Sequence, residues 1–342
     1  MATKNVFIAP RSFDKTTGQA TARLLEAGCA LTYWEGEGRP GEEALIAALH
    51  DADANAAIIG LEPVTARVLD AAPRLRVVGK YGVGLDNIDL AAARARGIWV
   101  TWTPDASTNS VAELTVALML ALARRVPEGD RIVKRGGWER VVGVELSGKT
   151  VGLVGLGRIG RRVAALLAGF GVRLLATELV QDAAFAAQHG ITYVPLEELL
   201  GESDFVSLHV PLTDTTHALI DTAALARMKP TAYLVNTARG GLVDEAALAE
   251  ALRAGWLAGV ATDVYATEPP ASSPLLALDE VTAARVIATP HTGAHSQDAI
   301  NAVSVQTAEN IIAVLEGRRP PFPAPGFEGL ETPQSQQHST QE

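Results

Sequence analysis

Three glycines, Gly155, Gly157 and Gly160, have a spacing that could bind a dinucleotide. They fall in the stretch VGLVGLGRIG, an apolar strand-like run followed by the start of a helix. In this G-x-G-x-x-G pattern the first glycine allows a tight bend, the second lets a pyrophosphate approach the backbone, and the third lets helix pack on strand. The amides of Arg158 and Ile159 would open the helix, where the helix dipole favours an anion. The sequence therefore predicts a dinucleotide-binding turn.

An acidic residue follows at the distance that a ribose contact requires. Glu178 lies 18 residues after Gly160, at the end of the next strand-like run, and about 20 residues is the usual spacing. A carboxylate there accepts hydrogen bonds from both ribose hydroxyls and repels a 2′-phosphate. The next residues, LVQD, offer no arginine for such a phosphate, so we expect NAD rather than NADP.

Three further residues could perform the reaction beside the nicotinamide. Arg239, Glu268 and His291 each follow a strand-like segment, and in a parallel sheet the carboxyl ends of the strands face the ligand crevice. An arginine fork can hold a carboxylate and polarise the adjacent carbonyl. A histidine can carry the proton that accompanies a hydride, and a neighbouring glutamate stabilises the protonated ring. His209 also follows a strand and is expected to contact the cofactor.

Composition narrows the class of protein. The chain has 342 residues and a formal charge of −10, which argues against nucleic acid or an anionic membrane as the main partner. Cys29 is the single cysteine, so no intrachain disulfide can form, and its apolar surroundings indicate a buried structural residue. No metal site is predicted. The N-terminus has no long apolar segment, and we expect a cytoplasmic protein.

The elements that must position these residues form two βαβ series. Five strand-like runs precede residue 103 and about seven follow it, with helical Ala/Leu/Glu/Arg stretches between them. We therefore expect an α/β protein of two Rossmann-like, doubly wound parallel-sheet domains. Long apolar helices are predicted over 107–126 and 294–317. If the second returns to the first domain, the nucleotide-binding domain is an insertion in the substrate domain.

The expected boundaries follow from these two crossings of the chain. The expected domains are a discontinuous substrate domain over 1–103 and 295–325, an NAD-binding domain over 104–294, and a disordered polar tail over 326–342.

Over residues 50 to 318 the chain resembles the D-isomer-specific 2-hydroxyacid dehydrogenases, and within them the D-3-phosphoglycerate dehydrogenase-like members. The resemblance is carried by YGVGLDNIDLAAARARGI, LSGKTVGLVGLGRIG, HVPLTDTTHALID, MKPTAYLVNTARGGLVDEAALAEAL, GVATDVYATEPP and IATPHTGAHS. It implies that Arg239, Glu268 and His291 are catalytic. It also implies that Asp263 binds the amide group of the nicotinamide. Further cofactor contacts are implied for His209, Pro211, Thr237, Ala238 and Gly293. The amides of Val83 and Gly84 would hold the substrate carboxylate.

The substrate is expected to be a three-carbon acid that bears a phosphate or phosphonate, because Lys80 precedes the carboxylate loop where phosphoglycerate enzymes commonly have a basic residue. A solvated surface lysine is the plain alternative. Leu61 and Glu62 stand where those enzymes have an arginine for the phosphate, so glyoxylate or hydroxypyruvate reduction stays open, as does a formate- or phosphite-type dehydrogenase. A different class, an NAD(H)-sensing corepressor-like protein, also stays open. A homodimer is expected from the family and from the apolar helix over 107–126.

Overall fold

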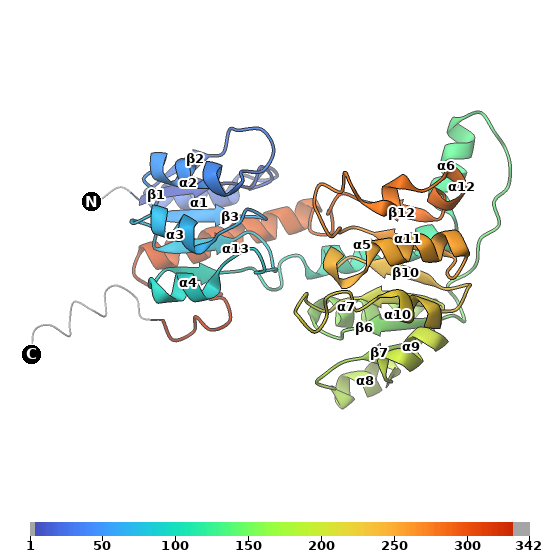
Figure 1. Cartoon of the computed structure of the whole chain (residues 1–342). Coiled ribbons are helices and arrows are strands. Elements are labelled where there is room, and N and C mark those ends of the chain that lie inside the picture. The colour runs from blue at the N-terminus through green and yellow to red at the C-terminus, as the bar shows by residue number, and fades with distance from the viewer. Residues whose placement is uncertain (1–3, 331–342) are drawn as a thin grey trace, which may run out of the picture. The chain divides into compact units, whose positions relative to one another are not determined.

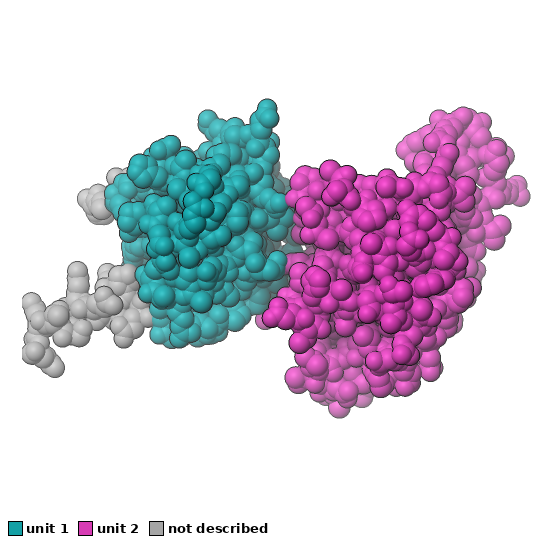
Figure 2. Space-filling view, in the orientation of Figure 1, with its two compact units in different colours: residues 1–107, 294–342 teal, residues 108–293 magenta. Residues whose placement is uncertain are grey.

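The computed structural model describes residues 4–330, which Figure 1 shows as a cartoon. The chain forms two compact units, one of residues 1–107 and 294–342 and the other of residues 108–293 (Figure 2). The second unit is therefore an insertion in the sequence of the first. Among the described residues, no helix is both long and apolar enough to cross a membrane.

The first unit contains a five-stranded sheet in the order β2-β1-β3-β4-β5, with every pairing parallel. Its strands are β1 (Lys4–Ile8), β2 (Cys29–Tyr33), β3 (Ala56–Ile59), β4 (Val77–Lys80) and β5 (Trp99–Thr101). Its helices are α1 (Gln19–Glu26), α2 (Glu42–Asp51), α3 (Ala66–Ala71), α4 (Leu90–Ala95) and α13 (Gln297–Leu315). Parallel pairing requires a crossover between strands, and the helices supply it.

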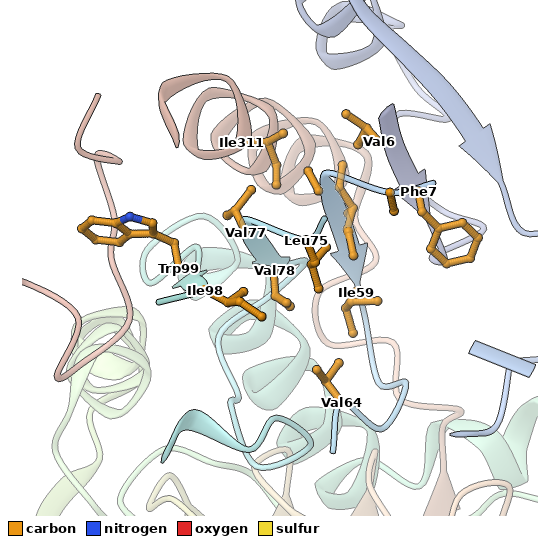
Figure 3. Close-up of a cluster of buried hydrophobic side chains, with 14 of the residues drawn as sticks. Val6, Phe7, Ile59, Val64, Leu75, Val77, Val78, Ile98, Trp99 and Ile311 are labelled. Carbon is orange, nitrogen blue, oxygen red and sulfur yellow. The ribbon is translucent and has the colours of Figure 1, made fainter. Parts of the chain in front are cut away.

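The last helix, α13, belongs to the core of the first unit. Ile311 points from α13 toward Val77 and its neighbours in the buried cluster (Figure 3). A Cβ on Gly79 would lie 2.9 Å from the Ile311 Cδ1 atom, so a larger residue in β4 would push helix and strand apart. The Arg76 side chain also donates to the carbonyl oxygen of Val314 at 2.9 Å. The chain thus returns to pack a helix on the sheet that its first residues form.

The second unit contains a seven-stranded parallel sheet in the order β12-β11-β10-β9-β6-β7-β8. The strands are β6 (Thr150–Val154), β7 (Arg173–Thr177), β8 (Ile191–Tyr193), β9 (Phe205–Leu208), β10 (Tyr233–Asn236), β11 (Gly259–Thr262) and β12 (Val286–Ala288). The α-helices are α5 (Thr108–Ala123), α6 (Val126–Lys134), α7 (Arg158–Leu167), α8 (Ala183–His189), α9 (Leu196–Glu202), α10 (Thr222–Arg227), α11 (Glu245–Ala254) and α12 (Glu280–Ala283). The order reverses between β6 and β9, which is where doubly wound sheets bind nucleotides.

Alternate residues of the central strands supply two cores, one on each face of this sheet. In β10, Leu234 belongs to the cluster packed with α9, α10 and α11, whereas Val235 belongs to the cluster packed with α5 and α7. Because side chains of a strand alternate between faces, both must be apolar when both faces are covered. This is why the strands read as continuous apolar runs.

Two sequence expectations about helices and tail need adjustment. The helix predicted to 126 ends at Ala123, because Arg125 has a φ of 50° and a new helix, α6, begins at Val126. Phe327, assigned to the polar tail, is 1% exposed in the first core, while residues 331–342 lie outside the described part of the chain. Cys29 is buried as predicted, and burial raises the pKa of its thiol.

Candidate active site

The glycine turn between β6 and α7 has the geometry that its sequence predicts. Gly155 has a φ of 95°, which favours glycine. A Cβ on Gly160 would lie 2.3 Å from the carbonyl oxygen of Gly155, so α7 can pack here only without a side chain. Apart from Gly157 and its two chain neighbours, no atom of residues 4–330 lies within 4 Å of the position that a Cβ on Gly157 would occupy. The turn therefore leaves open space at the start of α7, next to Arg158 and Ile159.

Glu178, directly after β7, binds the glycine turn from the side. One carboxylate oxygen accepts from the backbone N–H of Leu156 at 2.7 Å, and the other accepts from the N–H of Leu179 at 2.8 Å. A carboxylate can accept about four hydrogen bonds, so capacity remains for two ribose hydroxyls. Glu178 thus both orders the turn and presents acceptors beside it.

His209 follows β9 on the other side of the point where the strand order reverses. The backbone N–H of His209 donates to the carbonyl oxygen of Val154 at 2.7 Å. A Cβ on Gly160 would lie 3.6 Å from the Cβ of His209. Burial lowers the pKa of His209 from 6.5 to about 4. Its Nε2 is shielded from solvent and has no hydrogen-bond partner within residues 4–330. His209 is therefore a neutral ring against the glycine turn, and Pro211 lies exposed two residues further on.

The turn after β10 carries Arg239. Asn236, which is 2% exposed, donates from Nδ2 to the carbonyl of Arg239 at 2.9 Å and accepts from the N–H of Ala238 at 3.0 Å. The hydroxyl of Thr237 lies 2.8 Å from that of Thr115 in α5. These contacts fix the turn that carries the half-buried Arg239, whose guanidinium donates to the carbonyl oxygen of Ala238 at 2.8 Å.

Glu268 and His291 form a hydrogen-bonded pair. His291 Nδ1 donates to the Glu268 carboxylate, with distances of 2.8 and 3.0 Å to its two oxygens. The side chains are 22% and 31% exposed, so the pair is partly withdrawn from water. His291 has a φ of 54°, a left-handed conformation that costs about 1 kcal/mol or more and is common where function fixes a residue. Since Nδ1 is bound to Glu268, Nε2 is the nitrogen that can meet a substrate.

Asp263, which is 1% exposed, holds the loop that carries His291. Its carboxylate accepts from the Thr289 hydroxyl at 2.6 Å, from the N–H and hydroxyl of Thr292 at 2.8 and 3.2 Å, and from the N–H of Gly293 at 2.8 Å. Four donors match the capacity of a carboxylate. Positioning of this loop is therefore the role that the geometry displays, and contact with a nicotinamide amide stays a prediction.

In the first unit, the loop after β4 can offer two backbone donors. Gly82 has a φ of 134°, and its carbonyl accepts from the N–H and hydroxyl of Thr103, both at 3.1 Å. Within residues 4–330, the N–H groups of Val83 and Gly84 donate to no other group. Consecutive N–H groups without an internal partner can bind an anion such as a carboxylate.

Lys80, at the end of β4, is not the solvated surface lysine that was the plain alternative. It is 3% exposed, and its ammonium group donates to the carbonyl of Gly60 and, at 2.7 Å, to Oδ1 of Asn87. Asn87 Nδ2 in turn donates to the carbonyl of Glu62 at 2.6 Å. Lys80 is therefore part of a buried network that joins the loops after β3 and β4.

Together these features define a class of protein: an oxidoreductase in which a dinucleotide-binding sheet carries an arginine and a glutamate–histidine pair at its carboxyl edge. The glycine turn, the Glu178 carboxylate and the shielded His209 nitrogen fit a dinucleotide. The family model of the D-isomer specific 2-hydroxyacid dehydrogenase NAD-binding domain matches residues 116–293.

Known proteins resemble the chain over most of its length. It is 43% identical to a glyoxylate reductase of Korarchaeum cryptofilum over 304 residues, which cover 87% of this chain and 90% of that one. It is 44% identical to a D-3-phosphoglycerate dehydrogenase of Mycobacterium bovis over 280 residues, 81% of this chain but 52% of that one. A crystal structure from Thermus thermophilus matches with a TM-score of 0.84 and 40% identity, covering 93% of this chain and 99% of the other.

The chain belongs to the D-isomer-specific 2-hydroxyacid dehydrogenase family, and it is an NAD-dependent oxidoreductase. The resemblance inferred from its motifs is thereby confirmed, as is the two-domain parallel-sheet fold.

Several supporting residues escaped prediction from sequence. Asn236 lies directly before the predicted Thr237–Ala238 contacts, and Thr292 lies directly after His291. Adjacency to a predicted site residue was the available signal for both. Tyr265, Glu245 and Asn87 adjoin no predicted site residue, and they contact partners 21 to 25 residues away in the sequence.

Proposed function

We propose that the chain reduces glyoxylate or hydroxypyruvate with NADH to the corresponding 2-hydroxy acid. The observation that carries this choice is the burial of Lys80, whose ammonium group is already bound by Gly60 and Asn87. Glu62, also buried, accepts from the N–H of Gly60 at 2.6 Å, so the position where a phosphate-binding arginine would stand carries an inward carboxylate. The relative from Korarchaeum, named a glyoxylate reductase, supports the same choice. The first expectation from sequence, a phosphate-bearing acid, is therefore placed second.

The proposed reaction uses the pair at the carboxyl edge of the second sheet. Arg239 binds the substrate carboxylate and polarises the 2-oxo group. His291 donates a proton from Nε2 to the 2-oxo oxygen, while Glu268 at Nδ1 stabilises the charged ring. When bound, NADH supplies the hydride. Asp263 and Asn236 keep the two loops in place.

A panel of acids tests the proposal. NADH oxidation is measured with glyoxylate, hydroxypyruvate and phosphohydroxypyruvate, and NAD reduction with formate and phosphite. We expect the highest kcat/KM with glyoxylate or hydroxypyruvate. A preference for phosphohydroxypyruvate, or for formate or phosphite, would overturn the proposed substrate class. Tight NADH binding without turnover of any acid would indicate the corepressor-like alternative.

Lys80→Met separates a structural lysine from one that binds phosphate. Because Lys80 joins two loops of the first unit, its loss should change KM for hydroxypyruvate and phosphohydroxypyruvate by similar factors. A rise of KM for the phosphorylated acid alone, about tenfold or more as expected for a desolvated ion pair, would instead support a phosphate-bearing substrate. Thermal unfolding of the variant controls for loss of the fold.

We also propose that the chain forms a homodimer and acts in the cytoplasm. The apolar side of α5, from which a dimer was expected, is buried within its own unit against α7, β10 and β11. A group of exposed apolar side chains lies instead on α6 and the segment after it, namely Val126, Val133, Trp138, Val142 and Val144. A cavity of about 270 Å³ lined by Val142 and Tyr233 adjoins them. Such residues support an interface with a second copy.

Light scattering tests the dimer. Wild type should have twice the chain mass, and Val133→Glu with Val142→Glu should be monomeric. Leu25→Glu, at an exposed leucine of the first unit, is the matched control and should stay dimeric. A monomeric wild type would contradict the proposal.

A further inference from the structure

Glu245, at the start of α11, binds the loop that carries Glu268 at two points. Its Oε1 accepts from the backbone N–H of Ala266 at 2.7 Å, and its Oε2 accepts from the hydroxyl of Ser273. Ala266 lies two residues before Glu268 and Ser273 lies five residues after it. One carboxylate therefore fixes the loop on both sides of the residue that binds His291.

Glu245 is not required to cap its own helix. The side chain of Asp244, the N-cap residue, already accepts from the N–H groups of Ala246 and Ala247, both at 3.0 Å. The carboxylate of Glu245 is instead directed to a loop about twenty residues further along the chain. Its contacts are thus tertiary, and a local role in α11 does not explain them.

The peptide held by Glu245 also contacts the other two catalytic segments. A Cβ on Gly240, next to Arg239, would lie 1.9 Å from the carbonyl carbon of Tyr265, so the Arg239 turn packs directly against the Tyr265–Ala266 peptide. The Tyr265 hydroxyl donates to the carbonyl of Thr289 at 3.2 Å, two residues before His291. The Tyr265 N–H donates to Oε1 of Glu268 at 3.2 Å. The turns after β10, β11 and β12 therefore meet around Tyr265.

We propose that Glu245 is a positioning residue for the Glu268–His291 pair and for the Arg239 turn. It keeps the Tyr265–Ala266 peptide against Gly240 and thereby holds the Glu268 carboxylate on His291 Nδ1. Ala266 and Thr267 are exposed, so few apolar contacts hold this part of the loop without Glu245. The inference rests on the proposed hydride-transfer function, because that function makes the pair catalytic.

Two variants separate hydrogen bonding from mere bulk. Glu245→Gln can still accept from the Ala266 N–H and can donate to the Ser273 hydroxyl, whereas Glu245→Ala can do neither. With glyoxylate or hydroxypyruvate, Glu245→Ala should lower kcat about tenfold or more and change KM less than about threefold, as expected when a reacting group is misplaced. The pH–rate profile of Glu245→Ala should also differ from that of wild type, because Glu268 is then no longer held on the ring of His291. Glu245→Gln should restore kcat and the wild-type pH profile.

A second readout needs neither substrate nor cofactor. In the ligand-free protein, the His291 Nδ1–H proton bound to Glu268 should give a downfield NMR resonance, assigned by its loss in His291→Gln. Glu245→Ala should broaden or remove this resonance, and Glu245→Gln should keep it. Glu250→Ala, at an exposed glutamate of the same helix, is the matched control and should match wild type in every measurement.

The outcomes distinguish this inference from the proposed function. An unchanged pH profile and unchanged resonance in folded Glu245→Ala would overturn the inference, as would a Glu245→Gln variant no better than Glu245→Ala. If Glu245→Ala does not fold, Ser273→Ala removes one of the two contacts and should weaken the resonance partially. If wild type reduces no 2-oxo acid but the resonance responds as described, the positioning role stands and the proposed function fails.

Discussion

His209 should make the protein lose stability in mild acid. Burial lowers the pKa of His209 from 6.5 to about 4, so the folded chain keeps the ring neutral over a range in which the unfolded chain binds a proton. The contribution of the neutral His209 ring to the free energy of unfolding is fully present above pH 6.5 and is lost as pH falls toward 4. From pH 7 to pH 5 this one group should reduce the free energy of unfolding by about 2 kcal/mol.

The assay is urea unfolding followed by tryptophan fluorescence at pH 7 and pH 5, on the protein without cofactor. His209→Gln removes the titrating ring and should lose about 2 kcal/mol less than wild type between the two pH values. His50→Gln, at an exposed histidine of the first unit, is the matched control and should reproduce the wild-type loss.

The physical cause can also be checked directly. The imidazole resonances of His209, assigned by their absence in His209→Gln, should titrate near pH 4 in the folded protein. An equal acid-induced loss in wild type and His209→Gln, or titration of His209 near its ordinary pKa, would refute the argument that the ring is shielded above the glycine turn.

Three further predictions concern the cofactor and the reaction. Glu178→Ala should weaken NADH binding about ten- to a hundredfold, because a charge-assisted hydrogen bond is lost, and it should weaken NADPH binding far less. Fluorescence titration measures both affinities. Equal use of NADH and NADPH by wild type would contradict the assignment of Glu178 to the ribose. Gly160→Ala should abolish NADH binding in a folded protein, because its Cβ would lie 2.3 Å from the carbonyl oxygen of Gly155; titration with far-UV circular dichroism as control checks this. His291→Ala should lower kcat by about 10²–10⁴, which is the usual contribution of general acid catalysis. Glu268→Gln should lose more activity as pH rises. A pH–rate profile of unchanged shape in Glu268→Gln would count against a catalytic Glu268–His291 pair.

The sequence alone determined the class of fold and much of the site. The twelve apolar strand-like runs match the twelve strands of the two sheets, because strands covered on both faces must be apolar throughout. Gly155, Gly157 and Gly160 were readable because backbone constraints of a tight turn act on neighbours in the chain. Motifs around Arg239, Glu268 and His291 carried the family resemblance.

Only the tertiary structure determined the hydrogen-bond partners of the buried polar groups. The sequence left open whether Lys80 is solvated or binds a phosphate, and only the structure shows that it is buried with Gly60 and Asn87 as partners. The nicotinamide contact of Asp263 stays a prediction, but only the structure shows that its carboxylate also binds the loop of His291. A buried polar atom must find a partner, but the chain does not say which loop will supply it.

The contacts of Glu245 show the same limit most clearly. Its sequence position reads as an ordinary acidic residue in the first turn of a helix, where the helix dipole favours it. Its carboxylate nevertheless meets Ala266 and Ser273, 21 and 28 residues away. Local spacing determines which element a residue joins, whereas the packing of separate loops at one edge of a sheet determines what its side chain binds.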